Sequence, residues 1–145
     1  GTAAMAGGAD REQAVQYFPL DNPGAPISAA VRVGEVLYLS GQVGLNADGT
    51  VPEGIAAQTR IAMDRIVAIL DRAGLGMDHL FKCSVMLTDM NQWADFNKVY
   101  VSYFKPDRLP ARSAFGVSDL VRGVAVEIEC MAHAPARPHS LGKAD

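Results

Sequence analysis

The sequence predicts a single α+β domain in which several strands and two helices share one core. Its length of 145 residues is the usual size of one domain. Two segments repeat apolar residues at helical spacing, while five shorter segments are rich in β-forming residues or alternate apolar and polar side chains. Hydrophobic residues make up 49% and charged residues 20% of the chain, which is ordinary for a globular protein.

The first two expected strands form a hairpin. Residues 30–33 and 36–40 are rich in β-branched and aromatic residues, and Gly34-Glu35 between them is a short turn that contains glycine. Residues 46–50, Asn-Ala-Asp-Gly-Thr, predict a further turn. The chain therefore reverses direction twice before the first helix begins.

Helical periodicity begins at about residue 54 and continues to about residue 73. Gly74 then marks the end of the helix. The apolar positions recur at steps of three and four: Ile55, Ala62, Ile66, Ile69 and Ala73. A second helix is expected over about 92–104, before Pro106. Its aromatic residues lie at helical spacing, and we interpret them as core packing: Trp93, Phe96, Tyr100 and Tyr103 or Phe104.

Three more strands are expected, over residues 80–88, 111–118 and 124–133. In the first of them, one set of side chains is predicted to share a face: Phe81, Cys83, Val85 and Leu87. The order is then ββ-α-β-α-ββ. Two helices can cover only one face of such a sheet, so the other face must meet water or another subunit.

The two ends of the chain are expected to be flexible tails, over residues 1–11 and 135–145, on either side of a domain over 12–134. Gly1–Ala4 resembles the remnant of a tag before a native start at Met5. The beginning lacks the basic-then-apolar pattern of a signal peptide, and no apolar stretch is long enough to span a bilayer. We therefore expect a cytoplasmic protein with no membrane partner.

Composition and motifs exclude several classes of function. The net charge of −3 and the absence of a Lys/Arg run argue against a nucleic acid partner. The histidines, His79, His133 and His139, lack metal-site spacing, and there is no GxSxG or nucleotide-binding loop. We expect no cofactor and no metal. Cys83 and Cys130 belong to no CxxC motif and are interpreted as free buried thiols, although they could pair in an oxidising compartment.

Three positions are candidates for chemistry, each with a plainer alternative. In the last strand, Glu127 and Glu129 alternate with Val126, Ile128 and Cys130, so the carboxylates lie on the uncovered face, where they could simply be solvated. Arg112 offers a planar fork for a carboxylate but could be a surface arginine at a strand start. Gly41 could admit a ligand close to the backbone, and turn geometry would explain it equally well.

Several segments in order resemble the Rid (reactive intermediate deaminase, YjgF) family, from about Tyr17 to Ala134. They are 25–30 (APISAA), 39–44 (LSGQVG), 57–60 (AQTR), 87–90 (LTDM) with Trp93, 97–100 (NKVY), 110–113 (PARS) and 126–129 (VEIE). No single segment decides the matter, but together they are highly specific.

The resemblance implies a chorismate-mutase-like fold and a homotrimer whose uncovered sheet faces meet around the threefold axis. Active sites in such trimers lie in clefts between subunits. The carboxylate-binding arginine of the family falls on Arg112, and the strand glutamate that positions or activates water falls on Glu127. The asparagine of the second helix falls on Asn97, and the loop glycine falls on Gly41.

The sequence departs from the family pattern at two positions. Many deaminases of the family have a tyrosine where this chain has Ile27, and a cysteine where it has Ala114. The Ala114 backbone N–H can still donate to a carboxylate. Together with the bulky neighbour Phe115, the changes predict a more apolar pocket and a different imino acid as substrate.

The predicted function is the hydrolytic deamination of reactive 2-imino or enamine acids to 2-oxo acids and ammonia. Arg112 would hold the carboxylate and Glu127 would position the water, with Gly41, Ala114, Ile27, Asn97 and Phe115 around the substrate. One alternative is a non-catalytic protein that binds small carboxylates or acts as a chaperone. A third possibility is an endoribonuclease, which the charge of the chain opposes.

Overall fold

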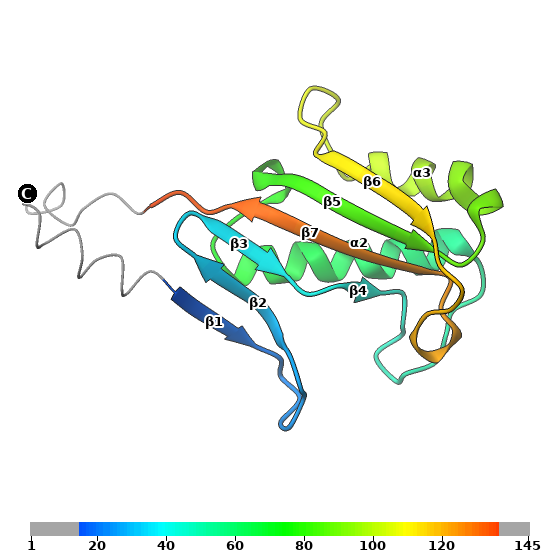
Figure 1. Cartoon of the computed structure of the whole chain (residues 1–145), viewed down its shortest axis with the longest axis horizontal. Helices are drawn as coiled ribbons and strands as arrows, with labels where there is room; N and C mark the ends of the chain where they lie inside the picture. Colours follow the sequence, from blue (N-terminus) through cyan, green and yellow to red (C-terminus); the bar gives the residue numbers. More distant parts are fainter. Residues whose placement is uncertain (1–14, 137–145) are drawn as a thin grey trace, which may run out of the picture.

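A mixed β-sheet forms one layer of the protein, in the strand order β1-β2-β3-β7-β5-β6 (Figure 1). The computed structural model describes residues 15–136. The strands are β1 Val15–Pro19, β2 Ser28–Val33, β3 Val36–Leu39, β4 Gln42–Val43, β5 Leu80–Leu87, β6 Ala111–Gly116 and β7 Val126–His133. The short β4 pairs with β7. Only β5 and β6 are parallel, and the other pairs are antiparallel.

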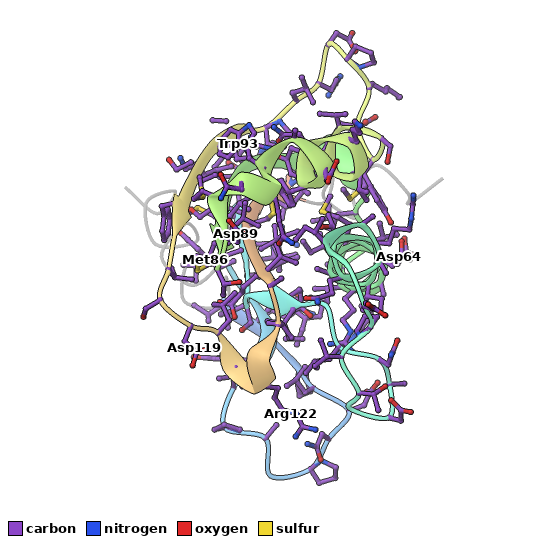
Figure 2. The ribbon with its side chains drawn as sticks, turned by 90° about the vertical axis from the view of Figure 1, so that its right-hand side faces the viewer. Asp64, Met86, Asp89, Trp93, Asp119 and Arg122 are labelled. Carbon is purple, nitrogen blue, oxygen red and sulfur yellow. A yellow bond between two sulfur atoms is a disulfide. The ribbon has the colours of Figure 1, made fainter. Side chains whose placement is uncertain are left out.

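Two helices form the second layer, and both lie on the same side of the sheet (Figures 1 and 2). They are α2 (Ile55–Arg72) and α3 (Trp93–Val101). Three short 3₁₀ turns complete the connections: η1 Met77–His79, η2 Met90–Gln92 and η3 Val121–Gly123. The predicted α+β domain with two helices on one face is confirmed. No helix within residues 15–136 is long and apolar enough to cross a membrane.

The helix α2 ends as the sequence predicts. Gly74 adopts a φ of +74°, and its N–H donates to the Asp71 carbonyl at 3.0 Å. The N–H of Leu75 then donates to the Leu70 carbonyl at 2.8 Å. This left-handed glycine satisfies the last carbonyls of the helix and turns the chain back toward β5.

The core lies between the sheet and the helices. In β7, Val126, Ile128 and Cys130 are almost completely buried, whereas Glu127 is half-buried and Glu129 is exposed. The predicted alternation of this strand is confirmed. Its carboxylates therefore point away from the helices, because successive side chains of a strand point to opposite faces.

Two strands and one helix boundary differ from the prediction. The edge strand β1 and the two-residue β4 were not expected, since each depends on a partner strand rather than on its own pattern. The helix α3 is shorter than the predicted 92–104. The difference lies mainly at its end, since α3 stops at Val101 and the N–H groups of Tyr103 and Phe104 donate three residues back, to the carbonyls of Tyr100 and Val101, both at 3.2 Å.

The predicted orientation of Phe81 is wrong. Its side chain is exposed, while Cys83, Val85 and Leu87 are buried as expected. The pairing of β5 with β7 shifts register between Leu80 and Lys82, so one extra residue enters β5 at this point. Such a bulge moves the side chain out of the alternation that the rest of the strand follows.

The interpretation of the cysteines as free thiols is also wrong. Cys83 in β5 lies directly opposite Cys130 in β7, and the two form a disulfide across 47 residues of sequence. Both side chains point toward the helices and are buried. The pairing depends on the register of two distant strands, which neither local sequence contains.

The sheet surface turned away from the helices, here called the open face, has many exposed apolar side chains. Strand pairing places them in register with the residues of β7 that share the face of Glu127, which are Glu127, Met131 and His133. They are Val15, Tyr17, Val33, Tyr38 and Phe115, each at least 45% exposed. Large exposed apolar patches mark surfaces that meet another molecule.

Only part of the expected tails lies within the described residues. The Arg32 guanidinium donates to the carbonyls of Ala134 and Pro135, at 3.1 and 3.2 Å. The N–H of Ala136 contacts the Glu35 carboxylate at 3.4 Å. Residues 1–11 and 137–145 lie outside the described residues.

Candidate functional site

Arg112 lies on β6, the edge strand of the sheet, and its side chain points beneath α3. One guanidinium nitrogen, Nη1, donates to Asn97 Oδ1 at 2.7 Å. The guanidinium carbon also lies 4.8 to 5.5 Å from the ring centres of Trp93, Phe96 and Tyr100. The arginine and the asparagine that were predicted to act together are therefore in direct contact.

The spacing of residues on α3 explains this arrangement. Trp93, Phe96, Asn97 and Tyr100 follow one another at steps of three, one and three, so they share one face of the helix. Cation–π contacts with these rings, together with the bond to Asn97, hold the guanidinium in one orientation. An arginine has five N–H donors, and among residues 15–136 Arg112 uses one of them, in the bond to Asn97, so most are available to a ligand.

The aromatic stripe is only partly the core packing that was predicted. Phe96 and Tyr100 are buried, but Trp93, at the start of α3 in Figure 2, is 37% exposed. The stripe packs the core and also surrounds Arg112. A helical aromatic stripe does not reveal this second role, because an arginine from another strand has to reach it.

The hydroxyl of Tyr100 is a polar group that sequence reasoning missed. It is buried and has no hydrogen-bond partner among residues 15–136. Burial raises the pKa of Tyr100, and the nearby positive charge of Arg112 opposes that rise. The neutral hydroxyl can donate a hydrogen bond, and buried polar groups normally have a partner. Tyr100 therefore places a hydrogen-bond donor beside the Arg112 guanidinium.

Glu127 and Gly41 form a second group, on and beside the open face. A Cβ atom added at Gly41 would lie 2.7 Å from Glu127 Oε2, so only glycine fits without displacing the carboxylate. Burial raises the pKa of Glu127, and the negative charge of Glu129 raises it further. A carboxyl group with a raised pKa is a stronger base once it is ionised.

The structure does not bring these two groups together within one chain. Arg112 is in register with Cys83 and Cys130, whereas Glu127 is in register with Met86 and Phe115. Cys130 and Glu127 are an odd number of residues apart on β7, so they point to opposite faces of the sheet. Arg112 therefore lies on the helix side and Glu127 on the open face.

The remaining predicted residues divide in the same way. Ala114 is on the same side as Arg112, in register with Val85, and packs against the core. Phe115 is on the open face, in line with Met86 and Glu127, and is exposed. Ile27 precedes β2 and is also exposed. Among residues 15–136, no group of three or more His, Cys, Asp or Glu side chains could hold a metal ion.

Residues 20–134 match the family model described as Endoribonuclease L-PSP. The chain belongs to the Rid (YjgF/RutC) family. It is 40% identical over 109 residues to the 2-iminobutanoate/2-iminopropanoate deaminase of Mus musculus, over 74% of this chain and 80% of the mouse protein. A RutC family protein of Pyrococcus horikoshii is 39% identical over 113 residues, which cover 77% of this chain and 89% of that protein.

Solved structures of Rid proteins have the same fold. The YjgF gene product from E. coli superimposes with a TM-score of 0.75 at 31% identity, over 83% of this chain and 99% of that chain. RidA from an Antarctic Psychrobacter gives a TM-score of 0.72 at 34% identity, over 83% and 98% of the two chains. The predicted family is thereby confirmed.

Proposed function

We propose that this Rid protein hydrolyses reactive 2-imino or enamine acids to 2-oxo acids and ammonia. The observation that carries the proposal is the Arg112 guanidinium, oriented by Asn97 and three aromatic rings and left with free N–H donors. A permanently charged planar fork is suited to a substrate carboxylate. The 40% identity to a mouse deaminase of 2-imino acids supports the same class of substrate.

In the proposed reaction, Arg112 binds the carboxylate, and the backbone at Gly41 and Ala114 orients the substrate. Glu127 accepts a proton from a water molecule while the water oxygen forms a bond to the imine carbon. Glu127 returns this proton to the former imine nitrogen, which gives a carbinolamine. The proton of the new hydroxyl group then passes to the nitrogen while the carbon–nitrogen bond breaks, so that ammonia leaves as the carbonyl forms. An enamine would first be protonated on carbon to give the imine. Positioning and proton transfer are the contributions asked of the protein.

The proposed active unit is a homotrimer with sites between subunits. Because Arg112 and Glu127 lie on opposite sides of one sheet, the Arg112 group of one protomer would face the Glu127 group of its neighbour. The exposed apolar residues of the open face support such an assembly, since trimer formation would remove them from water. Ile27 and Phe115, both exposed in the single chain, would then line an apolar part of the cleft.

The test is a coupled assay in which an amino-acid oxidase generates the imine in the presence of semicarbazide, which traps imine that is not hydrolysed. Wild-type protein is expected to suppress the trapped product. Arg112→Ala should lower this activity at least about tenfold, the equivalent of one lost charge-assisted contact. The exposed Arg108→Ala removes the same charge elsewhere and serves as the control.

A panel of imines, from alanine-derived to phenylalanine-derived, extends the test to the substrate. The apolar Ile27 and Phe115 predict a preference for the larger members. Saturable binding of small carboxylates without any turnover by wild-type protein would instead support a binding protein. Turnover that is unchanged in a folded Arg112→Ala trimer would remove Arg112 from the mechanism.

A further inference from the structure

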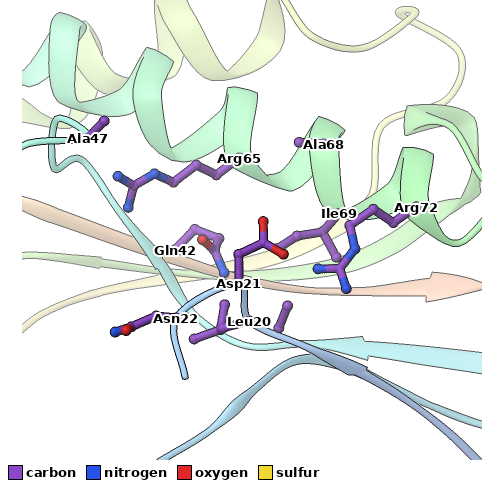
Figure 3. A pocket seen from close by; sticks show the side chains of 10 residues that line it. Leu20, Asp21, Asn22, Gln42, Ala47, Arg65, Ala68, Ile69 and Arg72 are labelled. Atoms are coloured by element: carbon purple, nitrogen blue, oxygen red, sulfur yellow. The ribbon is translucent and has the colours of Figure 1, made fainter. Parts of the chain in front are cut away.

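A cavity lies away from Arg112, between α2 and the segment that follows β1 (Figure 3). Its volume is about 570 Å³, within the usual range for sites of small ligands. The residues that line this cavity, here called the α2 pocket, include Leu20, Asp21, Gln42, Arg65, Ile69 and Arg72. Neither Arg112 nor Glu127 is among them.

Two arginines of α2 provide the positive charge of the pocket. Arg65 and Arg72 are seven residues apart, or about two helical turns and roughly 10 Å along the axis, so both face the same side. Arg65 donates to the carbonyls of Val43 and Leu45. Arg72 Nη2 donates to the Pro19 carbonyl at 2.8 Å. Each guanidinium is therefore held in place by backbone carbonyls, and within the described part of the chain each keeps further N–H donors.

One carboxylate lies between the two arginines. Figure 3 shows the Asp21 side chain between Arg65 and Arg72, beside the Gln42 amide. Within residues 15–136, neither arginine forms an ion pair with Asp21 or with another carboxylate at 4.0 Å or less. The pocket therefore combines two positive charges and one negative charge that do not neutralise one another by direct contact.

The pocket also has an apolar wall. Ala29 and Ile69 are buried residues of the core, and Leu20 packs against that core. Gln42 Nε2 donates to the Ser40 carbonyl at 3.0 Å, which orients the amide and leaves its oxygen as an acceptor. A ligand in this pocket would thus meet two cationic groups at its ends, an anionic group and an amide oxygen at its centre, and a short apolar surface.

We propose that the α2 pocket binds an acidic α-amino acid. The two carboxylates of the ligand would bind Arg65 and Arg72, and its ammonium group would bind Asp21 and the Gln42 oxygen. The methylene groups would lie on Leu20 and Ile69. The ligand charges, two negative and one positive, complement the two arginines and one aspartate of the pocket, and charge-assisted hydrogen bonds are the strongest polar contacts available.

The experiment is isothermal titration of the full-length protein with L-glutamate as the probe. Saturable binding with a Kd of about 1 mM or tighter is expected, since three charged contacts would be formed. Glutarate lacks the ammonium group and L-norvaline lacks the second carboxylate, so each should bind at least about tenfold more weakly. Equal affinity for all three compounds, or no saturable binding of L-glutamate, would overturn the proposal.

Variants locate the bound ligand. Arg72→Gln and Asp21→Asn alter exposed side chains and should each weaken L-glutamate binding at least about tenfold. Arg60→Gln removes an exposed arginine of α2 outside the pocket and should leave binding unchanged. Because Arg112 is itself a candidate carboxylate site, Arg112→Ala is the decisive comparison. Binding that survives this variant supports the α2 pocket, whereas binding that it abolishes while Arg72→Gln retains it refutes the proposal.

Discussion

The two faces of the sheet differ in how far the chain completes them by itself. On the helix side, Arg112 is held by Asn97 and aromatic rings of α3, all from the same chain. On the open face, Glu127 and Glu129 stand among exposed apolar side chains, and neither helix of residues 15–136 packs over this face. The helix side thus orients the Arg112 guanidinium with residues of its own chain, whereas the apolar side chains of the open face stay exposed in the single chain. Because these two groups lie on opposite faces, the proposed mechanism needs Arg112 and Glu127 to come from two different copies of this chain.

The sharpest test of this comparison mixes two inactive variants. Arg112→Ala and Glu127→Gln should each lose at least about tenfold in imine hydrolysis, because each removes one half of the proposed site. Trimers formed after the two variants are unfolded and refolded together should regain activity. Each mixed trimer contains one cleft in which an intact Arg112 meets an intact Glu127.

The control for this mixing experiment is the double variant Arg112→Ala/Glu127→Gln refolded with either single variant, which restores no complete cleft. Activity that fails to return in mixed trimers, with exchange verified by mass spectrometry, would contradict a site shared between subunits.

A charge on the open face should prevent association. Tyr38 is 46% exposed on this face, and Tyr38→Asp should convert the proposed trimer to monomers, because an aspartate would be desolvated in the proposed interface. Val101 is 48% exposed on α3, and Val101→Asp is the matched control. Sedimentation velocity measures the outcome, and a trimer that persists in Tyr38→Asp would exclude this face as the interface.

The Cys83–Cys130 disulfide joins β5 and β7 on the helix side of the sheet, and its reduction tests how much it stabilises the fold. The bond closes a loop across 47 residues, so its reduction should lower the free energy of unfolding by about 2–4 kcal/mol. Urea denaturation with and without a reductant measures the difference, and Cys83→Ala/Cys130→Ala shows whether reductant acts elsewhere. Two thiols that titrate in the unfolded, unreduced protein would show that the pair is not bonded.

The smallest expected effect is a pH shift on the open face. Glu127 acts as a base only when it is ionised, so activity should rise as pH increases through its raised pKa. Glu129→Gln removes a negative charge that raises this pKa, and the acidic limb of the kcat/KM profile should therefore move to lower pH. The limb should stay above the ordinary glutamate range, because burial, the larger cause, remains. If the acidic limb of the profile does not move, its pKa belongs to a group other than Glu127.

Much of the fold could be predicted because it depends on local periodicity. The helix α2, its glycine stop and the alternation along β7 follow from side-chain spacing within one segment. The strands β1 and β4 were missed because they are defined by their partners. The bulge that exposes Phe81 was missed for the same reason, since it exists only in the pairing of β5 with β7.

The candidate site shows the same division. Arg112, Gly41 and Glu127 were singled out by residue type and position, and the resemblance to Rid proteins assigned their roles and added Asn97. The structure places Arg112 in contact with Asn97, and it leaves no room for a Cβ atom at Gly41 beside Glu127. The Tyr100 hydroxyl and the α2 pocket were not found, because neither has a sequence pattern of its own.

The sequence by itself determined the family, the α+β class, the faces of the helices and the inward and outward sides of β7, because these depend on residues close together in the chain. Only the tertiary structure decided that Cys83 meets Cys130, that the aromatic residues of α3 surround Arg112, and that Arg112 and Glu127 lie on opposite faces. Each of these outcomes depends on the register between strands distant in sequence, and a shift of one residue would reverse every side chain of a strand.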